Sequence, residues 1–327
     1  MSLKPQDLVR LPYDDSLTLA GVTYACRSMH YCQSPSRRVS AHRIRRSVAT
    51  VAAELAFRRW LDAEDVPYGL IQATPFTRPN HYTITVGGRR LDVRSIFITS
   101  RQQIRRLRQD PSWLLQIEAL IPIDQLTSDF LSTGDPYAFV IIAGLETRTQ
   151  AELQRALAAA QPSFLIAIPP VRAWRQIQPK RSLGQLMLRN NDLQSIDIEL
   201  SGQLADHRLI SEQLTLLPGQ QTELPIDLAS VHYIHSTRPL VGIINVHSPT
   251  LRRTWSVGPQ SWSNIWIYGL EVVLAGWCTK RAFQSRAHFL PAGSQTHLGR
   301  RTSNDNRALP ISQLRPIREL VDLIDQR

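Results

Sequence analysis

The feature that most constrains this fold is the strict alternation of apolar and polar residues on both sides of Gly87-Gly88. The apolar set is Tyr82, Ile84, Val86, Leu91 and Val93. A Gly-Gly pair between two alternating runs is typical of a two-residue β-hairpin turn. The predicted register pairs Val86 with Arg89, Thr83 with Asp92, and His81 with Arg94. Because opposed side chains share a face, the hairpin should present one polar face containing Asp92 and Arg94.

Composition describes an ordinary globular chain. The 327 residues are 43% hydrophobic and 20% charged, which fits two domains with a substantial core. No apolar run approaches the roughly 18 residues that a membrane span needs, and the N-terminus lacks the apolar core of a secretory signal. We therefore expect no membrane partner. With 3 cysteines and no disulfide framework, a reduced, cytoplasmic protein is expected.

The charge balance points to a polyanionic partner. The formal net charge is +11 and the sequence pI about 10.2, and the only lysines are Lys4, Lys180 and Lys280, so the excess is arginine. Arginine binds phosphate in bidentate fashion, and a strong basic excess favours nucleic acid. An arginine-biased genome is the alternative explanation. The residues expected to contact DNA are Arg43, Arg45, Arg46, Arg101 and Arg105.

The first part of the chain alternates helical and strand patterns. Residues 1–38 form an irregular arm with one possible strand over 17–24. After it we expect a helix over 40–62 capped by Ser40, a strand over 66–76, the hairpin, a basic helix over 101–108, strands over 137–145 and 164–168, and a helix over 149–160. This order predicts an α/β domain with a mixed sheet over residues 39–175.

The character of the sequence changes after a linker at 176–184. Short strand patterns punctuated by Pro, Gly and Ser predict an all-β sandwich or jelly-roll over 185–327, closed by a helix at 317–325. This region carries Trp255, Trp262, Trp266 and Trp277. We expect them in the core. The alternative is an accessible aromatic face, including Trp266, that binds sugar rings or a protein partner.

One carboxylate stands out on the helix expected over 40–62. Glu54 lies at the border of the apolar stripe formed by Ile44, Val48, Val51 and Leu55. A helix-surface glutamate paired with Arg58, four residues later, is one interpretation. A functional carboxylate is the other.

The helix that bears Glu54, the strand, the hairpin and the following helix resemble the PD-(D/E)xK nuclease superfamily, over roughly residues 40–170. Asp92-Val93-Arg94 stands where members carry (D/E)-x-K, and Asn80 stands where the PD acid is expected. The resemblance implies a restriction-endonuclease-like α/β/α fold in which Glu54 and Asp92 bind Mg²⁺ and DNA is the substrate. Such sites use metal-bound water to cut phosphodiesters.

The sequence departs from that pattern at two positions. Asn80 replaces the aspartate, and Arg94 replaces a lysine although arginine is a poor proton acceptor. Three hypotheses follow for this domain: an active nuclease with a variant site, a degenerate one that keeps DNA binding, or an unrelated α/β domain. A hypothesis of another class is an interaction or carbohydrate-recognition protein that works through the β-sandwich.

Overall fold

The computed structural model describes residues 3–29, 40–70, 84–170, 174 and 182–325. The chain divides into two compact units. Unit 1 comprises residues 1–21, 46–146 and 267–327, and unit 2 comprises residues 22–45 and 147–266. Two helices, α1 (Asp15–Ser28) and α2 (Ala41–Ala63), contribute to both units. The protein is mixed α/β, as the sequence predicts.

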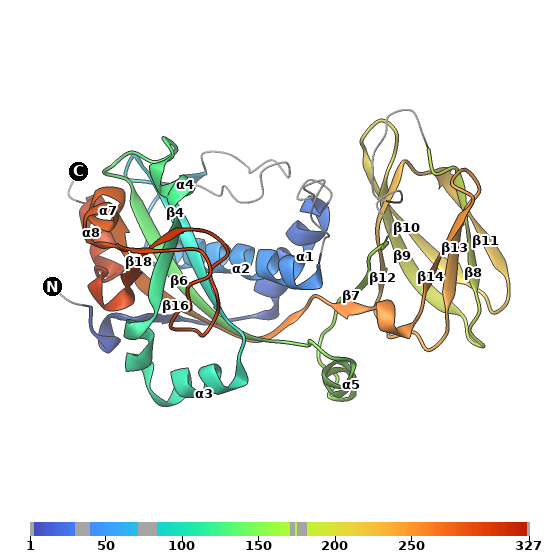
Figure 1. Ribbon diagram of the computed structural model, residues 1–327, viewed down its shortest axis with the longest axis horizontal. Coiled ribbons are helices and arrows are strands. Elements are labelled where there is room, and N and C mark those ends of the chain that lie inside the picture. The colour runs from blue at the N-terminus through green and yellow to red at the C-terminus, as the bar shows by residue number, and fades with distance from the viewer. Residues whose placement is uncertain (1–2, 30–39, 71–83, 171–173, 175–181, 326–327) are drawn as a thin grey trace. The chain divides into compact units, whose positions relative to one another are not determined.

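Unit 1 is built on a six-stranded mixed sheet (Figure 1). Its order is β1 (Val9–Leu11), β16 (Ile267–Thr279), β6 (Pro136–Glu146), β4 (Arg89–Ile98), β3 (Ile84–Val86) and β2 (Tyr68–Leu70). Only β4 and β6 pair in parallel, and the other neighbours are antiparallel. The parallel pair is connected through α3 (Arg101–Gln109), as parallel strands require a crossover.

The hairpin prediction is confirmed where the structure describes it. Gly87 and Gly88 both adopt positive φ, at 55° and 71°, which the two central positions of a type I′ turn require. Val86 lies opposite Arg89, and Ile84 lies opposite Leu91. The predicted pairs of Thr83 with Asp92 and His81 with Arg94 involve residues outside the described part of the chain.

Different elements cover the two faces of this sheet. The Thr50 hydroxyl of α2 lies 3.0 Å from the Ser95 hydroxyl of β4, so α2 covers the face to which Ser95 points. The other face packs into a core that includes Phe139, Ile141 and Phe283. This core is completed by α3, η2 (Pro111–Gln116), α7 (Lys280–Arg286), η4 (Ile311–Gln313) and a small sheet of β17 (His288–Leu290), β18 (Asn306–Pro310) and β5 (Glu118–Pro122). The remaining elements of unit 1 are η1 (Pro5–Asp7), α4 (Ile123–Thr127) and α8 (Arg318–Asp325).

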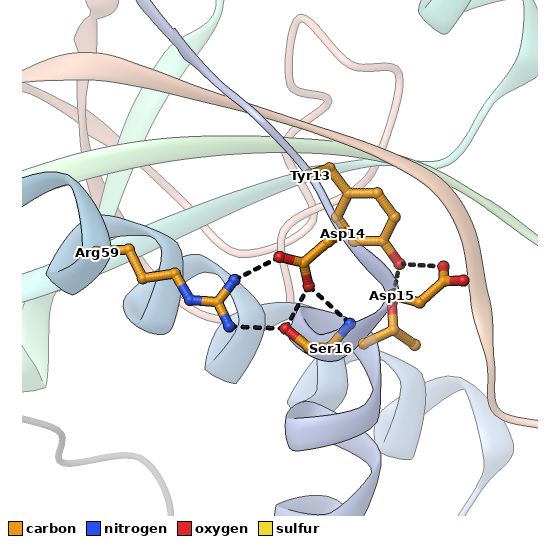
Figure 2. A network of polar contacts seen from close by, with 6 residues as sticks. Tyr13, Asp14, Asp15, Ser16 and Arg59 are labelled. Carbon is orange, nitrogen blue, oxygen red and sulfur yellow. Dashed lines mark hydrogen bonds and ion pairs between the residues drawn. The ribbon is translucent and has the colours of Figure 1, made fainter. Parts of the chain in front are cut away.

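The strand expected over residues 17–24 is wrong, because this segment is part of α1. Buried positions recur at Leu17, Gly21 and Ala25, which is a helical period of four. Asp14 begins the helix by accepting the Ser16 backbone N–H at 2.8 Å. Figure 2 shows Arg59 of α2 completing this network, with its Nη1 donating to Asp14 Oδ2 at 2.8 Å and its Nη2 donating to Ser16 Oγ at 2.7 Å.

Unit 2 is a β-sandwich. One sheet has the order β10 (Leu209–Leu216), β9 (Ile196–Gln203), β12 (Ser230–Ser236), β7 (Leu165–Ala167) and β15 (Ser263–Asn264). The other has the order β11 (Gln221–Asp227), β8 (Gln185–Asn190), β13 (Ile244–Ser248) and β14 (Arg253–Val257). Both sheets contribute to a single buried core, with Leu200 and Ile234 from the first and Leu188 and Val246 from the second. This unit also contains α5 (Gln150–Ala158), capped by Thr149 and Glu152, and η3 (Pro259–Ser261).

The boundaries differ from the expected division into 39–175 and 185–327. Residues 267–327 return to unit 1, because β16 inserts between β1 and β6 in the large sheet. Conversely, β7 joins the sandwich. The sequence patterns identify these strands but carry no information about their pairing. Trp266 is 7% exposed and Trp277 is fully buried, so the expected core role holds and Trp266 offers no accessible aromatic face.

Candidate functional site

The pattern of faces along β4 decides which predicted site residues meet. From Asp92 to Ile98, β4 pairs with β6 without a register shift, so its side chains alternate regularly. Ser95 points to α2, and therefore Asp92 and Arg94 share the opposite face. Glu54 lies on α2, one turn after Thr50, which contacts Ser95. The two predicted acids thus approach β4 from opposite faces.

Arg94 is held by three neighbours on its own face. Its Nη2 is bonded to the Asp92 carboxylate, and its Nη1 donates to Gln125 Oε1 of α4 at 2.5 Å. The guanidinium also lies 5.7 Å from the ring centroid of Tyr137, the residue that pairs with Asp92 in the sheet. Burial raises the pKa of Tyr137 to about 12, and the negative charge of Asp92 acts in the same direction. Arg94 therefore neutralises Asp92 in a largely enclosed position.

Glu54 forms an ion pair with Arg58, so the pairing in the first interpretation of this residue is confirmed. The surface position in that interpretation is wrong, because Glu54 is only 4% exposed. Burial raises the pKa of the Glu54 carboxyl to about 7. Arg58 opposes this shift, whereas the charge of Asp92 adds to it, so the two carboxylates repel each other electrostatically. A buried carboxylate with one cationic partner is a costly arrangement, which makes Glu54 the most unusual titratable group in this region.

The magnesium site expected at Glu54 and Asp92 stays a prediction. Mg²⁺ in proteins is bound through carboxylates that share its coordination shell. Here Glu54 and Asp92 lie on opposite faces of β4, and each is bonded to its own arginine. In the part of the chain that the structure describes, no group of three or more His, Cys, Asp or Glu residues is placed to hold a metal ion. Asn80 lies outside the described residues.

Several basic residues near the hairpin serve the fold rather than a ligand. Arg89 Nη1 donates to the Gly134 carbonyl at 3.2 Å, and Arg90 Nη1 donates to the Phe130 carbonyl at 2.9 Å. The Lys280 ammonium donates to the carbonyls of Ser128 and Leu131 at 2.6 and 2.9 Å. All three cations donate hydrogen bonds to backbone carbonyls of the segment 128–135. Sequence reasoning missed Lys280 because it reaches this segment from about 150 residues away.

The basic face of α3 has a different character. Ile104 and Leu107 are buried, while Arg101, Arg105, Arg106 and Arg108 are exposed. Arg108 forms an ion pair with Glu271, and the Arg106 guanidinium lies 5.2 Å from the Trp113 ring centroid. The helix contains no acidic residue. Arg101 and Arg105, one turn apart, therefore present a local excess of positive charge, and their role as DNA contacts stays a prediction.

A distant segment extends this basic surface. Gln103 of α3 donates to the Leu298 carbonyl at 3.0 Å, and Arg300 Nη2 donates to Thr99 Oγ1 at 3.0 Å. These contacts place the loop around residues 297–301 beside the N-terminus of α3. We call Arg101, Arg105, Arg106 and Arg300 the α3 patch. Sequence reasoning did not include Arg300, since nothing in its local sequence indicates proximity to α3.

The three arginines predicted on α2 have different environments. Arg45 is only 7% exposed, and its Nε donates to the Asn264 carbonyl at 2.7 Å, so the prediction of a DNA contact at Arg45 is wrong. This side chain supports the packing of unit 2. Arg43 and Arg46 are exposed. The division of the chain assigns Arg43 to unit 2 and Arg46 to unit 1.

Comparisons with known proteins add no family assignment. No family model, curated protein or solved structure matches this chain. Among the described residues, no helix combines the length and the hydropathy needed to cross a bilayer. Cys26 and Cys278 are buried free thiols. The function must therefore be argued from the geometry alone.

Proposed function

We propose that this protein binds DNA through the α3 patch, and that unit 1 is a restriction-endonuclease-like domain whose cleavage site is degenerate. The fold proposal is supported by the element order. The glutamate-bearing α2 is followed by the antiparallel strands β2, β3 and β4 and then by α3. After the intervening η2, β5 and α4 comes β6, which pairs in parallel with β4. The resemblance to the PD-(D/E)xK superfamily implies this order of helix, strand, hairpin and helix.

The absence of cleavage is proposed from the pairing of the acids. A metal-dependent nuclease needs carboxylates free to share one ion. Arg58 and Arg94 instead neutralise Glu54 and Asp92 on separate faces of β4. Position 94 also carries an arginine where the motif has a lysine, and a guanidinium is a poor proton acceptor for the attacking water.

One observation carries the binding proposal: the α3 patch gathers arginines from two distant segments without an acidic residue on the helix itself. Phosphate contacts by such residues release counterions, and this makes the affinity fall steeply with salt.

Binding is tested by fluorescence anisotropy with a labelled DNA duplex over a series of salt concentrations. The double variant R101Q/R105Q should weaken binding and reduce the log–log salt slope by about 2, since each phosphate contact contributes about 0.9. The control is R252Q/R253Q, which removes the same charge from exposed positions in unit 2. Equal losses in both double variants would show a general charge effect and overturn the assignment to α3.

Cleavage is tested separately by incubating supercoiled plasmid with the protein and Mg²⁺ or Mn²⁺. We expect no nicking by the wild type above a no-protein control. Nicking that disappears in the Asp92→Ala variant would show an active site and overturn the degenerate assignment. The binding test is read first, because a protein that does not bind DNA would also fail to nick it.

The alternative function, recognition of a carbohydrate or a protein through the β-sandwich, has mixed support. The burial of Trp266 removes the aromatic platform on which sugar binding was predicted. The loops at one end of the sandwich carry exposed aliphatic side chains, and these are considered separately below.

A further inference from the structure

Four exposed aliphatic side chains meet at one end of the unit 2 sandwich. Leu193 is 93% exposed and Val241 is 86% exposed, and Leu217 and Ile243 are 45% and 43% exposed. They belong to the connections between β8 and β9, β10 and β11, and β12 and β13. We call these four residues the loop apex. Exposed apolar side chains gathered in neighbouring loops mark a candidate interaction site.

Buried polar groups fix the three loops to one another. Asn190 is fully buried, and its side-chain N–H groups donate to the carbonyls of Gln194 and Leu216 at 2.8 and 3.0 Å. Its own carbonyl accepts the Gly219 N–H of the second loop at 2.8 Å. The third loop is joined by the Asn191 N–H, which donates to the Ile243 carbonyl at 2.9 Å. These hydrogen bonds therefore hold the three loops in fixed positions relative to one another.

A second set of hydrogen bonds, made by Asp192, connects the loop of Leu193 with the loop of Val241. The two oxygens of Asp192 accept the backbone N–H groups of Leu193 and Gly242 at 2.6 and 2.8 Å. Gly242 is required here, since a Cβ on it would lie 2.6 Å from Asp192 Cβ. The two most exposed aliphatic residues thus flank a tight contact between loops. Asp192 is the single carboxylate of these three loops, and both of its oxygens accept backbone N–H groups.

The chemistry of the apex favours a lipid surface over a protein. The side chains of Leu193 and Val241, exposed by about nine-tenths, protrude from the surface. Protein interfaces rely on Trp, Tyr and Arg, with Leu and Val under-represented, whereas the apex is entirely aliphatic. Aliphatic tips gain free energy by entering the acyl region. The exposed guanidinium groups of Arg189 and Arg238, at the bases of two of the loops, would then meet anionic headgroups.

We propose that the loop apex inserts into the surface of an anionic membrane, with Leu193 and Val241 in the acyl region and Arg189 and Arg238 at the phosphates. This contact is peripheral and requires no membrane-spanning helix. The sequence-based expectation of no membrane partner rested on the lack of a spanning run and of a secretory signal, and neither criterion concerns a peripheral contact. The inference is independent of DNA binding, because it rests on unit 2 and the α3 patch belongs to unit 1.

The test is sedimentation of the full chain with vesicles of phosphatidylcholine containing about a third phosphatidylglycerol. L193Q/V241Q should reduce the bound fraction about tenfold without changing net charge, given the apolar transfer that it removes. L209Q is the matched control, since Leu209 is an exposed leucine at the opposite end of β10. R189Q/R238Q should abolish the preference for phosphatidylglycerol, whereas R252Q/R253Q should leave it intact. Thermal unfolding of each variant checks that the fold is retained.

A probe at the tip separates insertion from electrostatic adsorption through the α3 patch. A Leu193→Cys variant in a Cys32→Ser background is labelled with an environment-sensitive fluorophore. Cys26 and Cys278 should not label, because burial raises the pKa of each thiol to about 12. We expect a blue shift on adding vesicles and none with Leu209→Cys. An unshifted probe at position 193, or equal sedimentation of L193Q/V241Q and wild type, would overturn the proposal.

Discussion

Arg94 lies two residues after Asp92 on β4, and its guanidinium neutralises that carboxylate on the face of the sheet opposite α2. The spacing that suggested a metal-binding acid and its lysine partner is therefore a local ion pair. Gln125 and Tyr137 enclose it further.

Removing Arg94 should destabilise unit 1. Arg94→Ala leaves Asp92 largely buried without its guanidinium, and we expect a loss of about 2 kcal/mol in the free energy of unfolding, less than for a fully buried pair because Arg94 is partly exposed. Urea denaturation measures it. The control is Arg208→Ala: Arg208 also pairs with an aspartate two residues earlier, but in an exposed position, so no measurable change is expected. Equal stability of the two variants would contradict the proposed role of Arg94.

Restoring the lysine of the nuclease motif should not restore cleavage. Arg94→Lys recreates the D-x-K spacing, yet Glu54 remains on the other face of β4 with Arg58. We therefore expect no nicking of plasmid by this variant with Mg²⁺ or Mn²⁺. Cleavage by Arg94→Lys would show that the face assignment does not prevent the two acids from sharing a metal ion.

Glu54 should make stability depend on pH. Its folded-state pKa of about 7 lies above the ordinary value of 4.5, so the folded state binds more protons between these two values. The contribution of Glu54 to the free energy of unfolding is then fully present below about pH 4.5. It is lost as the pH rises to about 7, by an amount on the order of 3 kcal/mol. Other groups also titrate in this range, so the comparison is with Glu54→Gln, which lacks this contribution. Denaturation curves for both proteins between pH 4.5 and 8 should diverge, and parallel curves would refute the shift.

Arg300 should contribute to DNA binding although it is about 200 residues from α3 in sequence. Its contact with Thr99 places it beside Arg101. Arg300→Gln should reduce the salt slope of DNA binding by about 1, comparable to Arg105→Gln. The control is Arg301→Gln, because Arg301 is exposed but has no contact with Thr99 among the described interactions. An unchanged slope for Arg300→Gln would remove this residue from the α3 patch.

Gly276 should be intolerant of substitution, because β16 is integral to unit 1. Its φ is 140°, and an added Cβ would lie 2.6 Å from the Arg315 carbonyl oxygen. Gly276→Ala should cost about 3 kcal/mol of stability. Gly269 in the same strand also has positive φ, at 54°, but open space around it, so Gly269→Ala should cost only about 1 kcal/mol. Thermal or urea denaturation distinguishes the two, and similar costs would argue against the close contact at Gly276.

The sequence by itself determined those features that depend on local physics. Gly87-Gly88 fixed the hairpin, since few other residues accept two consecutive positive φ values. The helix expected over 149–160 is present as α5, and continuous hydrophobicity indicated β6. The pairing of Glu54 with Arg58 was also foreseeable, because residues four apart on a helix are neighbours.

Only the tertiary structure decided what depends on contacts between distant segments. The insertion of β16 beside β6 moved residues 267–327 into unit 1, and no local pattern encodes which strands pair. The same holds for Lys280 at the segment 128–135, Arg300 beside α3, and the buried Arg45. Spacing along β4 placed Asp92 and Arg94 together, but the packing of α2 on the opposite face separated them from Glu54. A strand's alternation specifies two faces, and only its neighbours in the fold determine what each face meets.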